Sequence, residues 1–110
     1  MGLHPEDRIA HNETLFREVN ERIEAGLWPA ERAGPVAFRC ECGSLRCNQL
    51  VELTIAEYEH VRASPTHFLV LPGHEIPTVE HVVEREGTYV VVEKAGRAAK
   101  VAEETDPRDG

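Results

Sequence analysis

Residues 36–53 read VAFRCECGSLRCNQLVEL, with a cysteine-rich segment between two apolar runs. From Val36 to Cys42 every second residue is apolar or a cysteine, and this period of two predicts a strand. Leu50–Leu53 is a second apolar, strand-like run. The segment between the two runs is therefore expected at the turn of a β-hairpin.

Cys40, Cys42 and Cys47 are the only cysteines of the 110-residue chain, and they fall within eight positions. Residues two apart in a strand project from the same face, so Cys40 and Cys42 point together. A turn at Gly43-Ser44 folds Cys47 back towards them. We expect Gly43 to supply the positive φ that such a tight loop demands.

Three converging thiols predict a metal site. Zinc takes four ligands in a tetrahedron, with Zn–S distances of ~2.3 Å, so one ligand must come from elsewhere. Arg39 and Arg46 flank the cysteines and favour the thiolate, which is the form that binds metal. The candidates for the fourth ligand are the six histidines: His4, His11, His60, His67, His74 and His81.

His74 is the favoured candidate among these histidines. It lies in LPGHE, just past a predicted strand, where Pro72-Gly73 makes a sharp turn. A loop at the end of a sheet can reach the tip of a neighbouring hairpin. We therefore predict a Cys3His structural zinc site, with another histidine as the alternative fourth ligand. Its residues are Cys40, Cys42, Cys47 and His74.

Three other interpretations of the cysteines are open. They can be small apolar residues of an ordinary core. A Cys42–Cys47 disulfide, with Cys40 left as a thiol, would make a redox sensor. A zinc with three protein ligands and a water would make a small hydrolase, with Glu75 or Glu41 as the base. The hydrolase is disfavoured, because three thiolates make a poor Lewis acid and no His-Glu-x-x-His motif is present.

An N-terminal helix is predicted over about residues 5–26, because apolar residues recur there at three- and four-residue steps. These residues are Leu15, Phe16, Val19, Ile23 and Leu27. A linker rich in Pro, Gly and Ala follows at 28–35.

A second helix begins at a capping box, in which Thr54 caps the amide of Glu57 and Glu57 reaches back. Leu53 and Tyr58 form the hydrophobic staple around it. The helix runs through Val61 and ends near Ser64-Pro65.

The rest of the chain predicts strands over 67–71 and 89–93 and a terminal helix over 95–104. Residues 77–86 are ambiguous, and we favour a helix with Pro77 at its first position over a strand. The sum is an α+β fold: a small, mostly antiparallel sheet of about four strands, the N-terminal helix and two or three further helices. We expect one domain over 1–110, with a metal-bearing core at 36–104 and a tail at 105–110.

The net charge is −8, from 20 acidic and 12 basic residues, and the bases form no run. Phosphate binding needs clustered bases, so no nucleic-acid partner is expected. We see no secretory signal and no apolar run long enough to span a bilayer, and we expect a cytoplasmic protein without membrane contact. A protein partner or self-association is compatible with the apolar side of the first helix.

Four motifs resemble those of a group of small, uncharacterised bacterial proteins: FRCECGSLRC, LTIAEYEHVR, PGHE and YVVVEK. That group shares Phe-x-Cys-Glu-Cys, a later Cys, Leu-Thr-x-x-Glu-Tyr-Glu-x-Val-Arg and Pro-Gly-His. The resemblance covers about residues 12–108. It implies that the three cysteines and His74 act as a set, and it implies no substrate. We expect a non-enzymatic, zinc-binding regulatory or interaction module, with the redox sensor and the hydrolase as alternatives.

Overall fold

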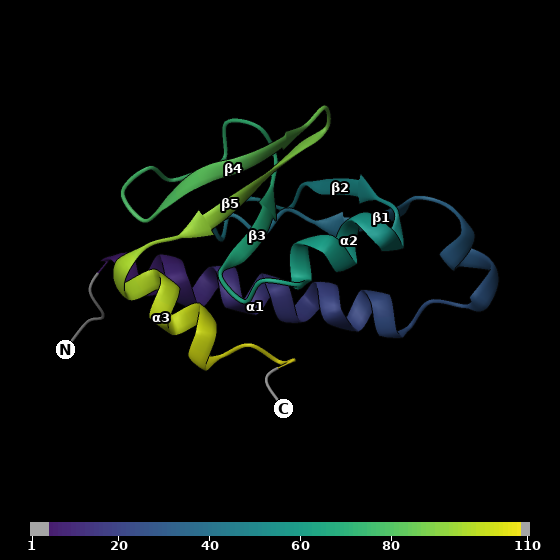
Figure 1. Ribbon diagram of the computed structural model, residues 1–110, viewed down its shortest axis with the longest axis horizontal. Coiled ribbons are helices and arrows are strands. Elements are labelled where there is room, and N and C mark those ends of the chain that lie inside the picture. The colour runs from purple at the N-terminus through teal and green to yellow at the C-terminus, as the bar shows by residue number, and fades with distance from the viewer. Residues whose placement is uncertain (1–4, 109–110) are drawn as a thin grey trace.

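The structure is a computed structural model that describes residues 5–108, with side chains described from residue 8 onwards (Figure 1). Within this range the fold is α+β, as predicted, with five strands in two antiparallel sheets instead of about four in one. The helices are α1 (Pro5–Ala25), the 3-10 helix η1 (Pro29–Ala33), α2 (Ile55–Arg62) and α3 (Gly96–Glu104). The strands are β1 (Val36–Arg39), β2 (Leu50–Leu53), β3 (His67–Val70), β4 (Glu80–Glu86) and β5 (Tyr89–Lys94).

The first sheet is the predicted hairpin. Strands β1 and β2 pair antiparallel, with Val36 opposite Leu53 and Arg39 opposite Leu50. One further backbone bond, from Cys40 N to Gln49 O at 3.0 Å, carries the pairing into the cysteine loop. The second sheet has the order β3-β5-β4, also antiparallel throughout.

The two sheets meet where the chain leaves β1. The backbone N–H of Glu41 donates to the carbonyl of Leu69 in β3 at 2.8 Å, and Leu69 N–H donates back to the Glu41 carboxylate at 3.0 Å. The segment 40–42 therefore runs beside β3. It is the seam between the sheets, and it carries two of the three cysteines.

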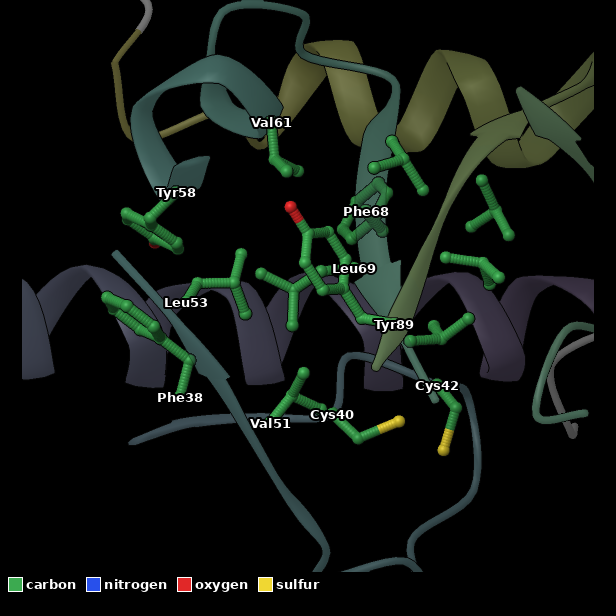
Figure 2. Packing of buried hydrophobic residues seen from close by; sticks show 14 of the residues in the cluster. Phe38, Cys40, Cys42, Val51, Leu53, Tyr58, Val61, Phe68, Leu69 and Tyr89 are labelled. Atoms are coloured by element: carbon green, nitrogen blue, oxygen red, sulfur yellow. The ribbon is translucent and has the colours of Figure 1, made fainter. Parts of the chain in front are cut away.

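The core lies between the sheets and α2. Figure 2 shows Phe38 and Tyr58 at one end of the buried cluster and the sulfurs of Cys40 and Cys42 at the other. The rings of Phe38 and Tyr58 stack with their centroids 4.1 Å apart. Burial of a large apolar side chain of this kind stabilises a fold by about 1.5–3 kcal/mol.

Helix α2 starts as predicted from its capping box. Thr54 Oγ1 accepts from Glu57 N at 3.1 Å, and the Glu57 carboxylate accepts from Thr54 N at 2.8 Å. This start fixes the phase of the helix, because residues four apart lie on one face. Tyr58 and Arg62 are both buried as a result.

Helix α1 buries only part of the face predicted: Phe16 is buried and Ile23 and Leu27 pack against the core. It runs beneath both sheets with α3 packed against it (Figure 1). Of the predicted apolar residues, Leu15 is 50% exposed and only Phe16 is fully buried. The same buried side also carries polar residues at steps of three and four: Glu13, Arg17 and Asn20. Their partners are charged or carbonyl groups of other elements, which apolar periodicity cannot reveal.

The helix predicted over 77–86 is wrong, because residues 80–86 form strand β4. The valines of this segment suit a pleated surface, since β-branched side chains pack well across neighbouring strands. Val82 lies opposite Val92, and a register shift follows between Val82 and Glu84. Glu80, at the start of this strand, is buried and paired with Lys94.

No helix in the described part of the chain is long and apolar enough to cross a membrane.

Candidate metal centre

The structure brings all four predicted ligand residues together. Cys40 directly follows β1, Cys42 and Cys47 lie in the hairpin loop, and His74 lies four residues after β3 ends. Their ligand atoms all lie within 4.8 Å of one another. Among residues 5–108 this is the one His, Cys, Asp or Glu group close enough to hold a metal ion.

The distances within the group fit a tetrahedral metal. His74 Nδ1 lies 3.7 Å from Cys40 Sγ and 3.6 Å from Cys47 Sγ. A tetrahedron with Zn–S of ~2.3 Å and Zn–N of ~2.0 Å places sulfur and nitrogen about 3.5 Å apart. The imidazole nitrogen therefore already has the separation from these two sulfurs that a shared metal ion requires.

Two turns aim the outer ligands at the centre. Cys47 N donates to Ser44 O at 3.1 Å, which folds the hairpin loop back on itself. His74 N donates to Leu71 O at 2.9 Å, and Gly73 takes φ +90° within that turn. The predicted sharp turn at Pro72-Gly73 is therefore present, and it directs the imidazole at the sulfurs.

Gly43 has a different role from the one predicted. It does not adopt a positive φ, whereas Gly73, Gly87 and Gly96 do. Its backbone instead approaches α1 so closely that a Cβ atom would lie 2.4 Å from Ile9 Cγ2. Asn12 Nδ2 also donates to Gly43 O at 2.9 Å. Glycine at 43 lets the first helix close over the cysteine loop.

Hydrogen bonds around the sulfurs favour a thiolate. The hydrogen bond from the Cys40 thiol lowers the pKa of Cys42 to about 4, although burial acts in the opposite direction. Hydrogen bonds from the Ser44 N–H and from His74 also lower this pKa. The Cys40–Cys42 hydrogen bond, together with burial, raises the pKa of Cys40. Leu71 N–H also donates to Cys40 Sγ at 3.2 Å. The pair thus holds one readily formed thiolate, which is the metal-binding form of cysteine.

Of the two flanking arginines, only Arg39 bonds the backbone of the cysteine loop among the described contacts. The Arg39 guanidinium donates to the Cys47 carbonyl and lies 3.8 Å over the Phe16 ring. Arg46 is exposed at the loop surface. Arg39 thereby fixes the end of the loop that carries Cys47.

The other described histidines lie outside the cluster. His60 pairs with Glu84, and His67 and His81 both contact Glu93. His11 is exposed on α1, and His4 lies outside the described residues. His74 is therefore the one described histidine positioned to complete a metal centre.

Glu41 points away from its neighbours Cys40 and Cys42, as alternation along an extended chain requires. Its carboxylate accepts hydrogen bonds from Arg62 and from Asn20 Nδ2 in the interior. Glu75 accepts from Gly73 N–H at 2.8 Å. Both carboxylates proposed as a base are thus engaged in structural contacts.

A second buried polar cluster was not predicted from the sequence. Lys94 lies between Glu13 and Glu80, and all three side chains are buried. Glu13 Oε1 has no hydrogen-bond partner among the described residues, and burial raises the pKa of Glu13 to about 7. The spacing of Glu13, Arg17 and Asn20 on one helix face was the available signal, but it is also typical of a solvated face.

No match to this chain is found among protein-family models, curated proteins or solved structures. The residues and their geometry are therefore the basis for any functional conclusion.

Proposed function

We propose that the protein is a non-enzymatic, zinc-stabilised regulatory or protein-interaction module. Its Cys3His site would be closed and structural, with Cys40, Cys42, Cys47 and His74 as ligands. One observation carries the proposal: four ligand atoms from three separate parts of the chain lie within 4.8 Å of one another.

The donor set supports zinc as the metal. Thiolate and imidazole ligands suit zinc, whereas calcium and magnesium require oxygen ligands. Iron–sulfur clusters take four cysteines as a rule, and the chain has three. Three sulfurs and one imidazole form a standard closed structural zinc site.

The position of the site supports a structural role. The segment 40–42 joins the two sheets through one backbone hydrogen bond and the side chain of Glu41. A metal there would tie the hairpin loop to the turn after β3. In a domain of 110 residues with a modest core, such a cross-link would raise the free energy of unfolding. The gain would be on the order of several kcal/mol after the entropy cost of ordering the ligands is subtracted.

The same geometry argues against the hydrolase. A catalytic zinc keeps a coordination position for water, whereas here a fourth side chain, His74, lies within reach of the metal position. A water activated at zinc would also need a free base, and the Glu41 carboxylate is held by Arg62.

The thiol redox sensor has a weaker basis. The three cysteines are free thiols that lie close together, and a reversible thiol–disulfide switch requires such a reduced state. However, Cys40, Cys42 and Cys47 are only 0%, 2% and 8% exposed, and oxidation by peroxide requires an accessible thiolate. Mass spectrometry after mild peroxide, showing a reversible Cys42–Cys47 bond in metal-loaded protein, would favour the sensor over the structural role.

The proposal is tested by counting metal in untagged protein and by removing it. Elemental analysis should give one zinc per chain, and Cys40→Ser should abolish it, whereas His67→Ala, which changes a histidine paired with Glu93, should not. Chelation of wild-type protein should lower the melting temperature by about 10 °C or more, since about 1 kcal/mol corresponds to several degrees in a domain of this size. An unchanged melting curve after complete metal removal would refute the structural role.

A further inference from the structure

The cysteine loop and the first turns of α1 enclose an open groove of about 430 Å³. Its walls are Arg8, Ile9 and Asn12 from the helix and Ser44, Leu45 and Arg46 from the loop. The volume lies within the range of about 300–1,000 Å³ found for ligand pockets. The groove is therefore large enough to take a few side chains of a partner.

The groove is basic in an acidic protein. The chain carries a net charge of −8, yet two of the six lining residues are arginines and none is a carboxylate. Three other bases have carboxylate partners: Arg62 pairs with Glu41 and Lys94 with Glu13 and Glu80 in the interior, and Arg108 pairs with Glu21 and Glu59 at the surface. Among the side chains described, those of residues 8–108, no ion pair engages Arg8 or Arg46.

Apolar surface lies beside these charges. Leu45 at the tip of the loop is 68% exposed, and Ile9 on the facing helix is half-buried. An exposed leucine on a loop tip buries little apolar surface in the free protein, whereas a docked partner would bury it in the interface.

The loop is held in place at several points. Cys42 and Cys47 begin and end it, so a metal bound there would fix both ends. Asn12 fastens Gly43 to α1, and the Ser44 hydroxyl accepts from Arg46 N–H at 3.3 Å. A loop ordered in advance loses less conformational entropy on binding.

We propose that this groove binds an acidic peptide segment of a partner protein, with a carboxylate between Arg8 and Arg46 and an apolar side chain against Leu45. Charge complementarity selects this occupant. The repulsion from the net negative charge is screened beyond ~8 Å at physiological salt, whereas a carboxylate in contact with the guanidiniums is not. The inference rests on the proposed function, because the bound metal holds the loop.

The test measures fluorescence anisotropy of a labelled octapeptide of glutamate, aspartate and leucine, titrated with zinc-loaded protein. Saturable binding is expected for this peptide and not for a counterpart with lysine in place of the acids. Arg46→Glu and Leu45→Ser should each weaken binding about tenfold, which corresponds to ~1.4 kcal/mol. Arg85→Glu, an equal charge reversal at an exposed residue of β4, should leave binding unchanged.

Three outcomes would overturn the inference. They are absence of saturable binding, equal weakening by Arg85→Glu and Arg46→Glu, and a concentration-dependent dimer that Leu45→Ser abolishes, which would make a second copy the occupant. Metal content measured on the same samples separates the two proposals. One zinc per chain without peptide binding refutes only the groove, whereas absence of zinc refutes the proposed function.

Discussion

The Glu41 carboxylate accepts two hydrogen bonds from the Arg62 guanidinium, at 2.6 and 2.8 Å, in the fully buried interior. Glu41 stands between two cysteines of the candidate metal centre, and Arg62 ends α2. The same carboxylate accepts from Asn20 of α1 and from Leu69 N–H of β3. One side chain thus joins two helices and both sheets directly behind the cysteines.

Removing the cation of this pair should be strongly destabilising. Arg62→Met leaves the Glu41 carboxylate buried without its countercharge, and such a loss costs about 3–5 kcal/mol. The double variant Glu41→Gln, Arg62→Met should recover part of this loss, because no charge is then left uncompensated. Urea denaturation of zinc-loaded protein measures both values.

Arg85→Met is the control for that series, since it changes an exposed arginine of β4 and should cost less than about 0.5 kcal/mol. If Arg62→Met also falls within that limit, the ion pair does not hold the sheets together.

Replacing His74 should weaken metal binding without abolishing it. His74→Ala leaves the three thiolates in place, so one metal should still bind. Loss of an outer-shell partner lowers metal affinity by about 10–100-fold, and loss of a direct ligand should exceed that range. Competition with a coloured zinc chelator measures the affinity, with His67→Ala as the control. Equal affinities for the two variants would mean that His74 is not the fourth ligand.

The features that the sequence predicted correctly depend on neighbours along the chain. Thr54 and Glu57 are three residues apart, and Pro72-Gly73 directly precedes His74, so local geometry suffices to predict the helix start and the turn. The convergence of the cysteines follows from strand alternation and a tight loop. His74 was predicted because the Pro72-Gly73 turn directly follows a strand, where a loop can reach the tip of a neighbouring hairpin.

The features that were mispredicted depend on partners distant in sequence. Residues 80–86 form a strand because β5 offers an edge to pair with, although a valine-rich segment after proline also suits a helix. Glu80 looks like a surface residue until Lys94 is placed beside it. Gly43 was assigned to a turn, whereas Ile9, 34 positions earlier, is what excludes a side chain there.

The stability of the folded chain should fall as the pH rises from 6 to 8. Burial raises the pKa of Glu13 to about 7, above its ordinary value of 4.5, against the opposing effect of Lys94. A raised pKa means that the folded state binds the proton more tightly, so its contribution is full below 4.5 and is lost as the pH passes 7. The negative charges of Cys42 and Glu41 also raise the pKa of Glu13, and Glu80 shares the Lys94 ammonium with it.

Glu13→Gln should flatten this dependence, since glutamine carries no proton to lose. Between pH 6 and 8 the wild type should lose about 1 kcal/mol relative to the variant, from the single titrating group. Denaturation of zinc-loaded protein at the two pH values measures the difference, and the range avoids acid release of the metal. Parallel pH profiles for the two proteins would contradict the role assigned to Glu13.

Adding one methyl group at Gly43 should separate α1 from the cysteine loop. In Gly43→Ala the new Cβ would lie 2.4 Å from Ile9 Cγ2 and 3.3 Å from Ile76 Cδ1, so overpacking should cost about 1–3 kcal/mol. The double variant Gly43→Ala, Ile9→Ala removes the closest contact, and its cost should be less than the sum of the single costs. Gly34→Ala is the matched control, because no atom lies within 4 Å of its added Cβ and its φ is −129°. If Gly43→Ala is as mild as Gly34→Ala in thermal unfolding, the helix does not pack on the loop as closely as the structure indicates.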